Sequence, residues 1–395
     1  MFLKKTPTEE KISSEQKTSP VKIPVKVICS ALIAVVSLAL TAGMLSCLLG
    51  HVGPGGAGDH TEAGIMDKID QFVTNDILVA LGDKIDVERT FWLRDSDMVA
   101  PEPDPSAFGQ TNDPTSLQWL LDDAAELLDG QELLFSTDTP IKKDTTVHYY
   151  LDETIFAITW KQVVYNCTYT FSEVKIAHPS QFRRFLSEGR YGSGVLHTTT
   201  EMAASVNAVV ASAGDYYTYR TGGLVVYNNT LYRDTGYFSL DTCYVNDEGD
   251  LLFTQRGQLN DVDAVNAYLE ENNVRFTLSF GPLMLKDGNY CVPAHYSLGE
   301  INDMYPRAAL CQMDKLHYVV VTANMEDPYY ARPTVSLFAR SLQDMGIPTA
   351  YTLDGGQTAT IVMNDQAINT ISYGSEREIS DILYFATAVP GNKSE

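Results

Sequence analysis

Residues 350–363 carry the pattern from which the fold and the site are inferred. They read Ala350-Tyr351-Thr352-Leu353-Asp354-Gly355-Gly356-Gln357-Thr358-Ala359-Thr360-Ile361-Val362-Met363. A helix predicted over residues 334–345 ends at Gly346 and leads into a short buried strand, which places Asp354 on a two-glycine turn. Because glycine lets a ligand approach the backbone closely, an acid at this strand end is a candidate site residue. By itself, Asp-Gly-Gly is also a common surface turn.

The surrounding sequence predicts an α+β fold around a mixed sheet. Runs rich in Tyr, Val, Ile, Thr and Trp predict strands over residues 145–151, 154–164 and 167–176. Hairpin turns are predicted at Asn228-Asn229, at 247–249 and at Asp287-Gly288. Further helices are predicted over residues 180–188, 200–206 and 262–271. Strands outnumber helices and many adjoin by hairpins, which favours α+β over a regular alternation of strand and helix.

A long apolar run near the N-terminus predicts a membrane span. Residues 27–50 contain no charged side chain, and at about 1.5 Å per residue they reach about 36 Å, enough for a hydrocarbon core of about 30 Å. Six lysines precede this run and no Lys or Arg stands in 51–58, so the C-terminal part is expected outside the cell. A cleaved signal peptide and lipidation at Cys47 are alternatives, and both leave the domain outside.

The chain is therefore divided into four predicted parts. These are a cytoplasmic tail (1–26), a transmembrane helix (27–50), a spacer and juxtamembrane helical region (51–140) and a main domain (141–395). The third part contains a glycine-rich spacer at 53–58, a helix over 65–81, an acidic proline linker at 101–105 and a helix from Ser116 as N-cap to Gly130. The juxtamembrane helix can pack on the domain or on a second copy, which leaves a homo-oligomer open.

Composition and motifs limit the partners. The formal net charge of −23 argues against nucleic acid, which needs clustered Lys and Arg. No HExxH, CxxC, Gly-x-Ser-x-Gly or phosphate-loop motif occurs, so no cofactor is evident, although a divalent metal stays open. The cysteines outside the span permit three pairings or serve as buried thiols: Cys167, Cys243, Cys291 and Cys311.

The stretch around Asp354 resembles the Asn-Leu-Asp-Gly-Gly-Gly-Ser motif of the phosphodiester glycosidase family. Other stretches from residue 145 onward are similar to further family motifs and occur in the family's order. They are 200–203, 211–217, 278–282 with 287–288, 306–309, and Arg377. The sequence departs from the family at Ala213 in place of Asn, Asp215 in place of the second Gly of that turn, Gln357 in place of the third Gly, and Thr358 in place of Ser.

The resemblance implies hydrolysis of a sugar 1-phosphodiester. It assigns Asp354 as the carboxylate at the anomeric carbon and Glu201 or Asp215 as a second carboxylate for water activation. Arg307 is the expected bidentate phosphate clamp. Arg377 either binds phosphate or pairs with Asp381 or Glu376. The remaining residues expected to line the site are Gly214, Tyr216, Gly355, Gly356 and Thr358.

Together these features predict a membrane-anchored extracellular hydrolase that acts on a carbohydrate or phosphoglycan of the cell surface. A different class of function is open as well, namely a non-catalytic protein that binds or assembles exopolysaccharide. In that alternative, the departures at Ala213 and Gln357 record a lost activity. The sequence leaves open which sugar is released and whether its anomeric configuration is retained.

Overall fold

A computed structural model describes residues 99–296, 301–324 and 332–389. The predicted cytoplasmic tail, membrane span, glycine-rich spacer and juxtamembrane helix lie outside these residues. Within the described ranges, none of the helices combines the length and the apolar character that crossing a bilayer requires.

The largest sheet has nine strands in the order β1-β2-β3-β4-β15-β14-β16-β12-β13. The three strands predicted between residues 145 and 176 are confirmed and lie next to one another in it. Their bounds and those of their neighbours are β1 (Phe108–Thr111), β2 (Val147–Leu151), β3 (Ile155–Val164), β4 (Cys167–Ile176), β15 (His317–Asn324), β14 (Arg307–Asp314), β16 (Thr349–Leu353), β12 (Leu283–Lys286) and β13 (Asn289–Tyr290).

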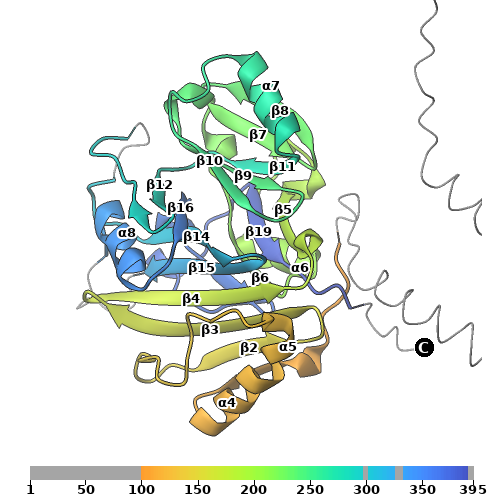
Figure 1. The fold of residues 1–395 in the computed structure, drawn as a ribbon, viewed down its shortest axis with the longest axis vertical. Coiled ribbons are helices and arrows are strands. Elements are labelled where there is room, and N and C mark those ends of the chain that lie inside the picture. The colour runs from red at the N-terminus through yellow and green to blue at the C-terminus, as the bar shows by residue number, and fades with distance from the viewer. Residues whose placement is uncertain (1–98, 297–300, 325–331, 390–395) are drawn as a thin grey trace, which may run out of the picture. The chain divides into compact units, whose positions relative to one another are not determined.

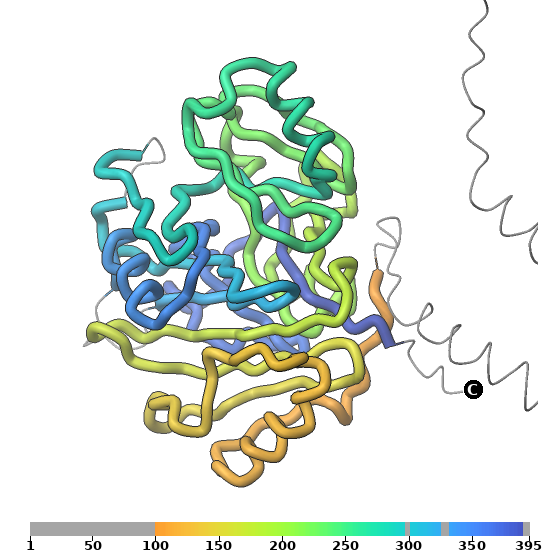
Figure 2. Tube along the Cα trace, viewed as in Figure 1, coloured from red at the N-terminus to blue at the C-terminus, as the bar shows by residue number. Residues whose placement is uncertain are grey.

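Three smaller sheets complete the β structure. A five-stranded sheet has the order β18 (Gln366–Ala367), β17 (Ile361–Met363), β6 (Val210–Ala213), β19 (Asp381–Phe385) and β5 (Phe182–Leu186). A three-stranded sheet contains β10 (Leu251–Thr254), β9 (Thr242–Asn246) and β11 (Val274–Leu278), and β7 (Gly223–Tyr227) pairs with β8 (Thr230–Thr235). Figure 2 shows the segments of these last two sheets gathered at one end of the folded part.

Every strand pair between named strands of the described residues is antiparallel, which corrects the prediction of a mixed sheet. Tight hairpins connect many neighbours, whereas parallel neighbours need long crossover connections. The predicted hairpin turns are confirmed, and Asn228, Asn229 and Asp287 adopt the positive φ that such turns require. The α+β class holds, with few helices beside the sheets.

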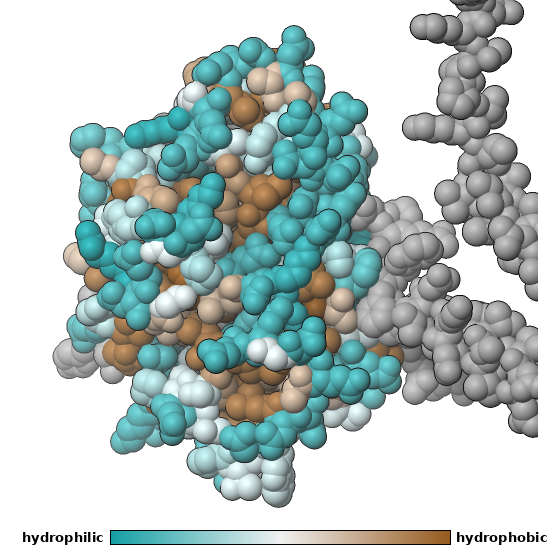
Figure 3. Space-filling view, viewed as in Figure 1, coloured by the Kyte–Doolittle hydropathy of each residue, from teal (hydrophilic) through white to brown (hydrophobic). Residues whose placement is uncertain are grey.

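Alternating side chains of the nine-stranded sheet face two different cores. Trp160 and Val319 pack toward α4 (Pro114–Asp123), α5 (Ala125–Leu128) and α8 (Val335–Asp344). Val320 and Leu310 face the five-stranded sheet. The outer face of that second sheet is covered by α6 (Thr199–Ser205), and Figure 1 shows α6 next to β6 and β5. The face of the molecule seen in Figure 3 is mostly hydrophilic and includes several smaller apolar patches.

Two predictions about helices need correction. The helix predicted over 180–188 is wrong, because one 3-10 turn is followed by β5, whose pairing with β19 overrides the local preference. Asp113, rather than Ser116, caps α4, with Pro114 at the first helical position. Leu117 and Phe135, which precede residue 141, share a core with Trp160.

The helices predicted over 200–206, 262–271 and 334–345 are confirmed. Helix α6 begins after Thr198, α7 spans Val262–Glu271, and α8 is capped by Thr334. Gly346 follows α8 with a φ of +82°, the left-handed conformation that ends helices. All four cysteines of the described residues are free thiols.

Candidate active site

The turn that carries Asp354 is fastened to two other strand ends. The Asp354 amide donates to the Gly214 carbonyl at 3.3 Å, directly after β6, and the Gly356 amide donates to the Pro306 carbonyl at 2.8 Å, directly before β14. A Cβ on Gly355 would lie 2.6 Å from the Pro306 oxygen, so this position requires glycine. The prediction that Asp354 lies at a strand end on a glycine turn is therefore confirmed.

Asp354 is a buried carboxyl group with only 8% of its surface exposed. Burial raises its pKa to about 6, while the Arg377 guanidinium and the nearby Thr358 hydroxyl act in the opposite direction. The Thr358 hydroxyl donates to the Gly355 carbonyl at 2.7 Å, which closes the turn. Asp354 therefore changes its charge close to neutral pH, as residues of catalytic sites often do.

Arg377 is the cation that acts most strongly on Asp354. Its guanidinium lies over the rings of Tyr216 and Tyr219, 5.4 and 4.7 Å from their centroids. These two rings stack on each other at 4.8 Å, and Tyr219 is 42% exposed. The side chain is thus held in place by aromatic faces at a point where the site meets solvent.

Asp215 lies beside this group, but its carboxylate is fully engaged. One oxygen accepts from the Tyr216 amide at 2.6 Å and from Arg220, and the other accepts from the Ser279 amide at 2.9 Å. The side chain is also buried. Because both oxygens already have partners, Asp215 fixes the turn after β6 and is poorly suited to activate water.

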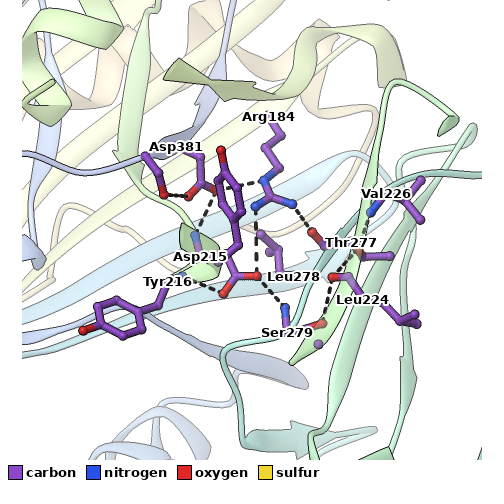
Figure 4. Close-up of polar contacts among 12 residues, drawn as sticks. Arg184, Asp215, Tyr216, Leu224, Val226, Thr277, Leu278, Ser279 and Asp381 are labelled. Atoms are coloured by element: carbon purple, nitrogen blue, oxygen red, sulfur yellow. Dashed lines mark hydrogen bonds and ion pairs between the residues drawn. The ribbon is translucent and has the colours of Figure 1, made fainter. Parts of the chain in front are cut away.

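A buried ion pair is hydrogen-bonded to the same turn. Arg184 of β5 donates from Nε to Asp381 at 2.8 Å, and the same Asp381 oxygen accepts from the Asp215 amide at 3.0 Å. Figure 4 shows Arg184 linked to both Asp381 and Asp215. A Cβ on Gly214 would lie 2.4 Å from this Asp381 oxygen, so glycine is needed here as well. Removing one partner of such a pair costs about 3–5 kcal/mol.

Residues 204–386 match the model of the phosphodiester glycosidase family. The resemblance predicted from the sequence is confirmed, and the match supports a glycosidase-type hydrolase. The matched segment contains Asp215, Asp354 and Arg377 and covers just under half of the chain.

Individual relatives are distant. The SPbeta prophage-derived uncharacterized protein YomE of Bacillus subtilis (strain 168) is 24% identical over 258 residues, which cover 63% of this chain and 38% of that protein. The chain thus spans well under two thirds of this relative's length.

Two solved structures are similar to parts of this chain. A hypothetical protein from Synechocystis gives a TM-score of 0.48 at 13% identity, over 63% of this chain and 64% of that one. The zebrafish N-acetylglucosamine-1-phosphodiester alpha-N-acetylglucosaminidase catalytic domain, auto-inhibited by its pro-peptide, gives 0.46 at 15% identity, over 66% and 92%.

Two residues expected in the phosphodiester glycosidase site have other partners. The Glu201 carboxylate accepts from the amide and hydroxyl of Thr198 at 2.8 and 3.0 Å, so it caps α6. The Arg307 guanidinium donates to the carbonyls of Pro333 and Asp303 at 3.3 and 2.6 Å, on the segments around β14 and α8. On β14, Arg307 directly precedes Ala308, which pairs with Leu353 of β16. The Arg307 Cα would lie 3.5 Å from a Cβ on Gly355, so the Arg307 backbone borders the Asp354 turn.

The alternative partners considered for Arg377 are also engaged elsewhere. Asp381 pairs with Arg184, and Glu376 accepts from the amide and hydroxyl of Thr200 at 3.1 and 2.5 Å. Sequence reasoning missed Arg184 and Arg220. Two arginines in the β-prone run Phe182-Arg183-Arg184-Phe185 could have signalled a buried cation, because charged residues enter a core only when paired.

The departures from the family motif keep the turn intact. Gln357, which stands where the family has a third glycine, donates from its side-chain amide to the Ser375 carbonyl at 2.8 Å. This bond ties the Asp354 turn to the segment that precedes Arg377. Among the described residues, no group of three His, Cys, Asp or Glu side chains is arranged to hold a metal ion.

Proposed function

We propose that this chain hydrolyses a glycosyl phosphodiester. The bond between the anomeric carbon and the phosphate oxygen breaks, water adds to the carbon, and a free sugar and a phosphomonoester are released. The observation that carries the proposal is Asp354, a buried carboxyl group that titrates near neutral pH within the segment matching the phosphodiester glycosidase family.

Hydrolysis of a glycosyl phosphodiester requires one carboxylate and one cation. A departing glycosyl carbon becomes positively charged, and a nearby carboxylate stabilises or attacks it. The phosphate leaving group is already acidic, so it needs a positive charge more than a proton donor. Arg377, held over the rings of Tyr216 and Tyr219 beside Asp354, supplies that charge. A single available carboxylate is sufficient in this scheme, which agrees with the engagement of Asp215 and Glu201.

The location of the substrate follows from the sequence. The apolar run at 27–50 and the lysines before it support an anchor in the cell membrane with the domain outside. We infer that the substrate is a polysaccharide or phosphate-linked glycan of the cell surface.

The test is release of free sugar from a sugar 1-phosphodiester by the full chain. Asp354→Asn should lower turnover about 100-fold or more. Asp365→Asn is the matched control, because it removes an exposed carboxylate in the turn between β17 and β18 and should leave turnover unchanged. Equal turnover in wild type and Asp354→Asn removes Asp354 from the mechanism. A wild-type chain that binds glycan without releasing sugar instead supports the non-catalytic alternative.

A further inference from the structure

A second group of tyrosines forms a stack that leads from the site to the surface. The rings of Tyr217 and Tyr191 lie 5.5 Å apart at an interplanar angle of 28°, and those of Tyr191 and Tyr232 lie 5.2 Å apart at 25°. Tyr217 is buried and Tyr191 is half-buried, whereas Tyr232 is 46% exposed. We refer to these three residues as the tyrosine stack.

The inner end of the tyrosine stack is joined to the Asp354 site through the backbone. Tyr217 follows Tyr216, whose ring lies beneath Arg377. The Tyr217 ring packs against Arg184 at 5.5 Å, and its carbonyl accepts from Arg233 at 2.8 Å. The segment that carries Tyr216, one of the two rings beneath Arg377, therefore also carries Tyr217, the buried end of the tyrosine stack.

Packing alone explains only the buried end of this arrangement. Tyr217 belongs to a small core cluster with Leu186, Val225 and Tyr227. Tyr232 lies on β8, a strand of a two-stranded sheet whose residues are half-buried or exposed. An aromatic ring that lies flat on another ring and keeps nearly half of its surface in solvent offers an apolar face with a polar rim, which suits the flat C–H face of a sugar.

We propose that the exposed face of Tyr232, with Tyr191 stacked behind it, forms a subsite for a sugar residue beyond the one that is cleaved. The inference rests on the proposed function and adds the class of substrate: an oligomeric glycan with phosphodiester linkages, rather than an isolated sugar phosphodiester. Stacking at this subsite supplies binding energy remote from the reacting carbon.

The experiment compares two substrates of the full chain. One is a sugar 1-phosphate methyl ester, which carries no second sugar beyond the phosphate. The other is an oligomer of sugars joined by phosphodiesters. Tyr232→Ala should raise KM for the oligomer about tenfold, equivalent to about 1.4 kcal/mol, and leave kcat/KM for the methyl diester unchanged. Tyr232→Phe, which keeps the ring, should behave as the wild type. Tyr165→Ala is the matched control, because it removes an exposed tyrosine on the β3–β4 turn.

The outcomes separate this inference from the proposed function. Loss of activity toward both substrates, or toward neither, overturns the subsite. If the wild type hydrolyses no phosphodiester, the proposed function fails, and titration calorimetry with the oligomer then decides the subsite by itself. Weaker binding by Tyr232→Ala than by Tyr232→Phe supports the subsite in that case, and equal binding overturns it.

Discussion

Replacing Asp354 by asparagine should stabilise the folded protein at neutral and alkaline pH while it removes activity. Burial raises the pKa of Asp354 from 3.8 to about 6, so the folded state holds its proton more tightly than the unfolded chain does. The raised pKa makes ionisation costly: no cost exists below pH 3.8, it grows between pH 3.8 and 6, and it is complete above pH 6. At about 1.4 kcal/mol per pKa unit, the full cost is about 3 kcal/mol.

The measurement is the free energy of unfolding from urea titrations of wild type and Asp354→Asn at pH 4, 5, 6, 7 and 8. The difference between the two proteins should change by about 2.4 kcal/mol between pH 4 and pH 8, in favour of the variant, with a little under half of the change complete at pH 5. Arg377 loses its carboxylate neighbour in the variant, but it keeps its contacts with two tyrosine rings. If the difference in the free energy of unfolding does not vary with pH, or grows in favour of the wild type, the conclusion that burial makes the ionised Asp354 carboxylate costly is refuted.

Two further predictions test the roles of neighbouring charges. The kcat/KM for sugar release should rise with pH through about 6 as Asp354 loses its proton. Arg377→Met should move this rise to higher pH, because the guanidinium lowers the pKa of Asp354. A pH profile that does not move in this variant would show that Arg377 does not act on the charge of Asp354. Glu201→Ala should lower the melting temperature by removing the cap of α6 and leave the rate of sugar release unchanged. A large loss of rate in that variant would restore Glu201 to the catalytic group.

Local signals in the sequence predicted much of the fold around the site. β-prone runs predicted β2, β3 and β4, and turn residues predicted the hairpins that follow Tyr227 and Lys286. The helix that ends at Gly346 and the strand that ends at Leu353 placed Asp354 correctly at a strand end. These features depend on residues close together in the chain, whose conformations and periodicity are largely local.

The sequence by itself determined the strand that ends at Asp354 and the glycines that make its turn. It also indicated Arg377, which follows the Asp354 motif in the chain as the corresponding arginine does in the family. Only the tertiary structure decided which charges meet. Arg184 and Asp381 are 197 residues apart in the chain, and their pairing depends on the antiparallel contact of β5 and β19. The same contacts engage the Asp215 carboxylate, while a local cap engages Glu201. Burial and charge partners set the pKa of a carboxyl group, and both arise from packing between distant segments that a linear pattern does not specify.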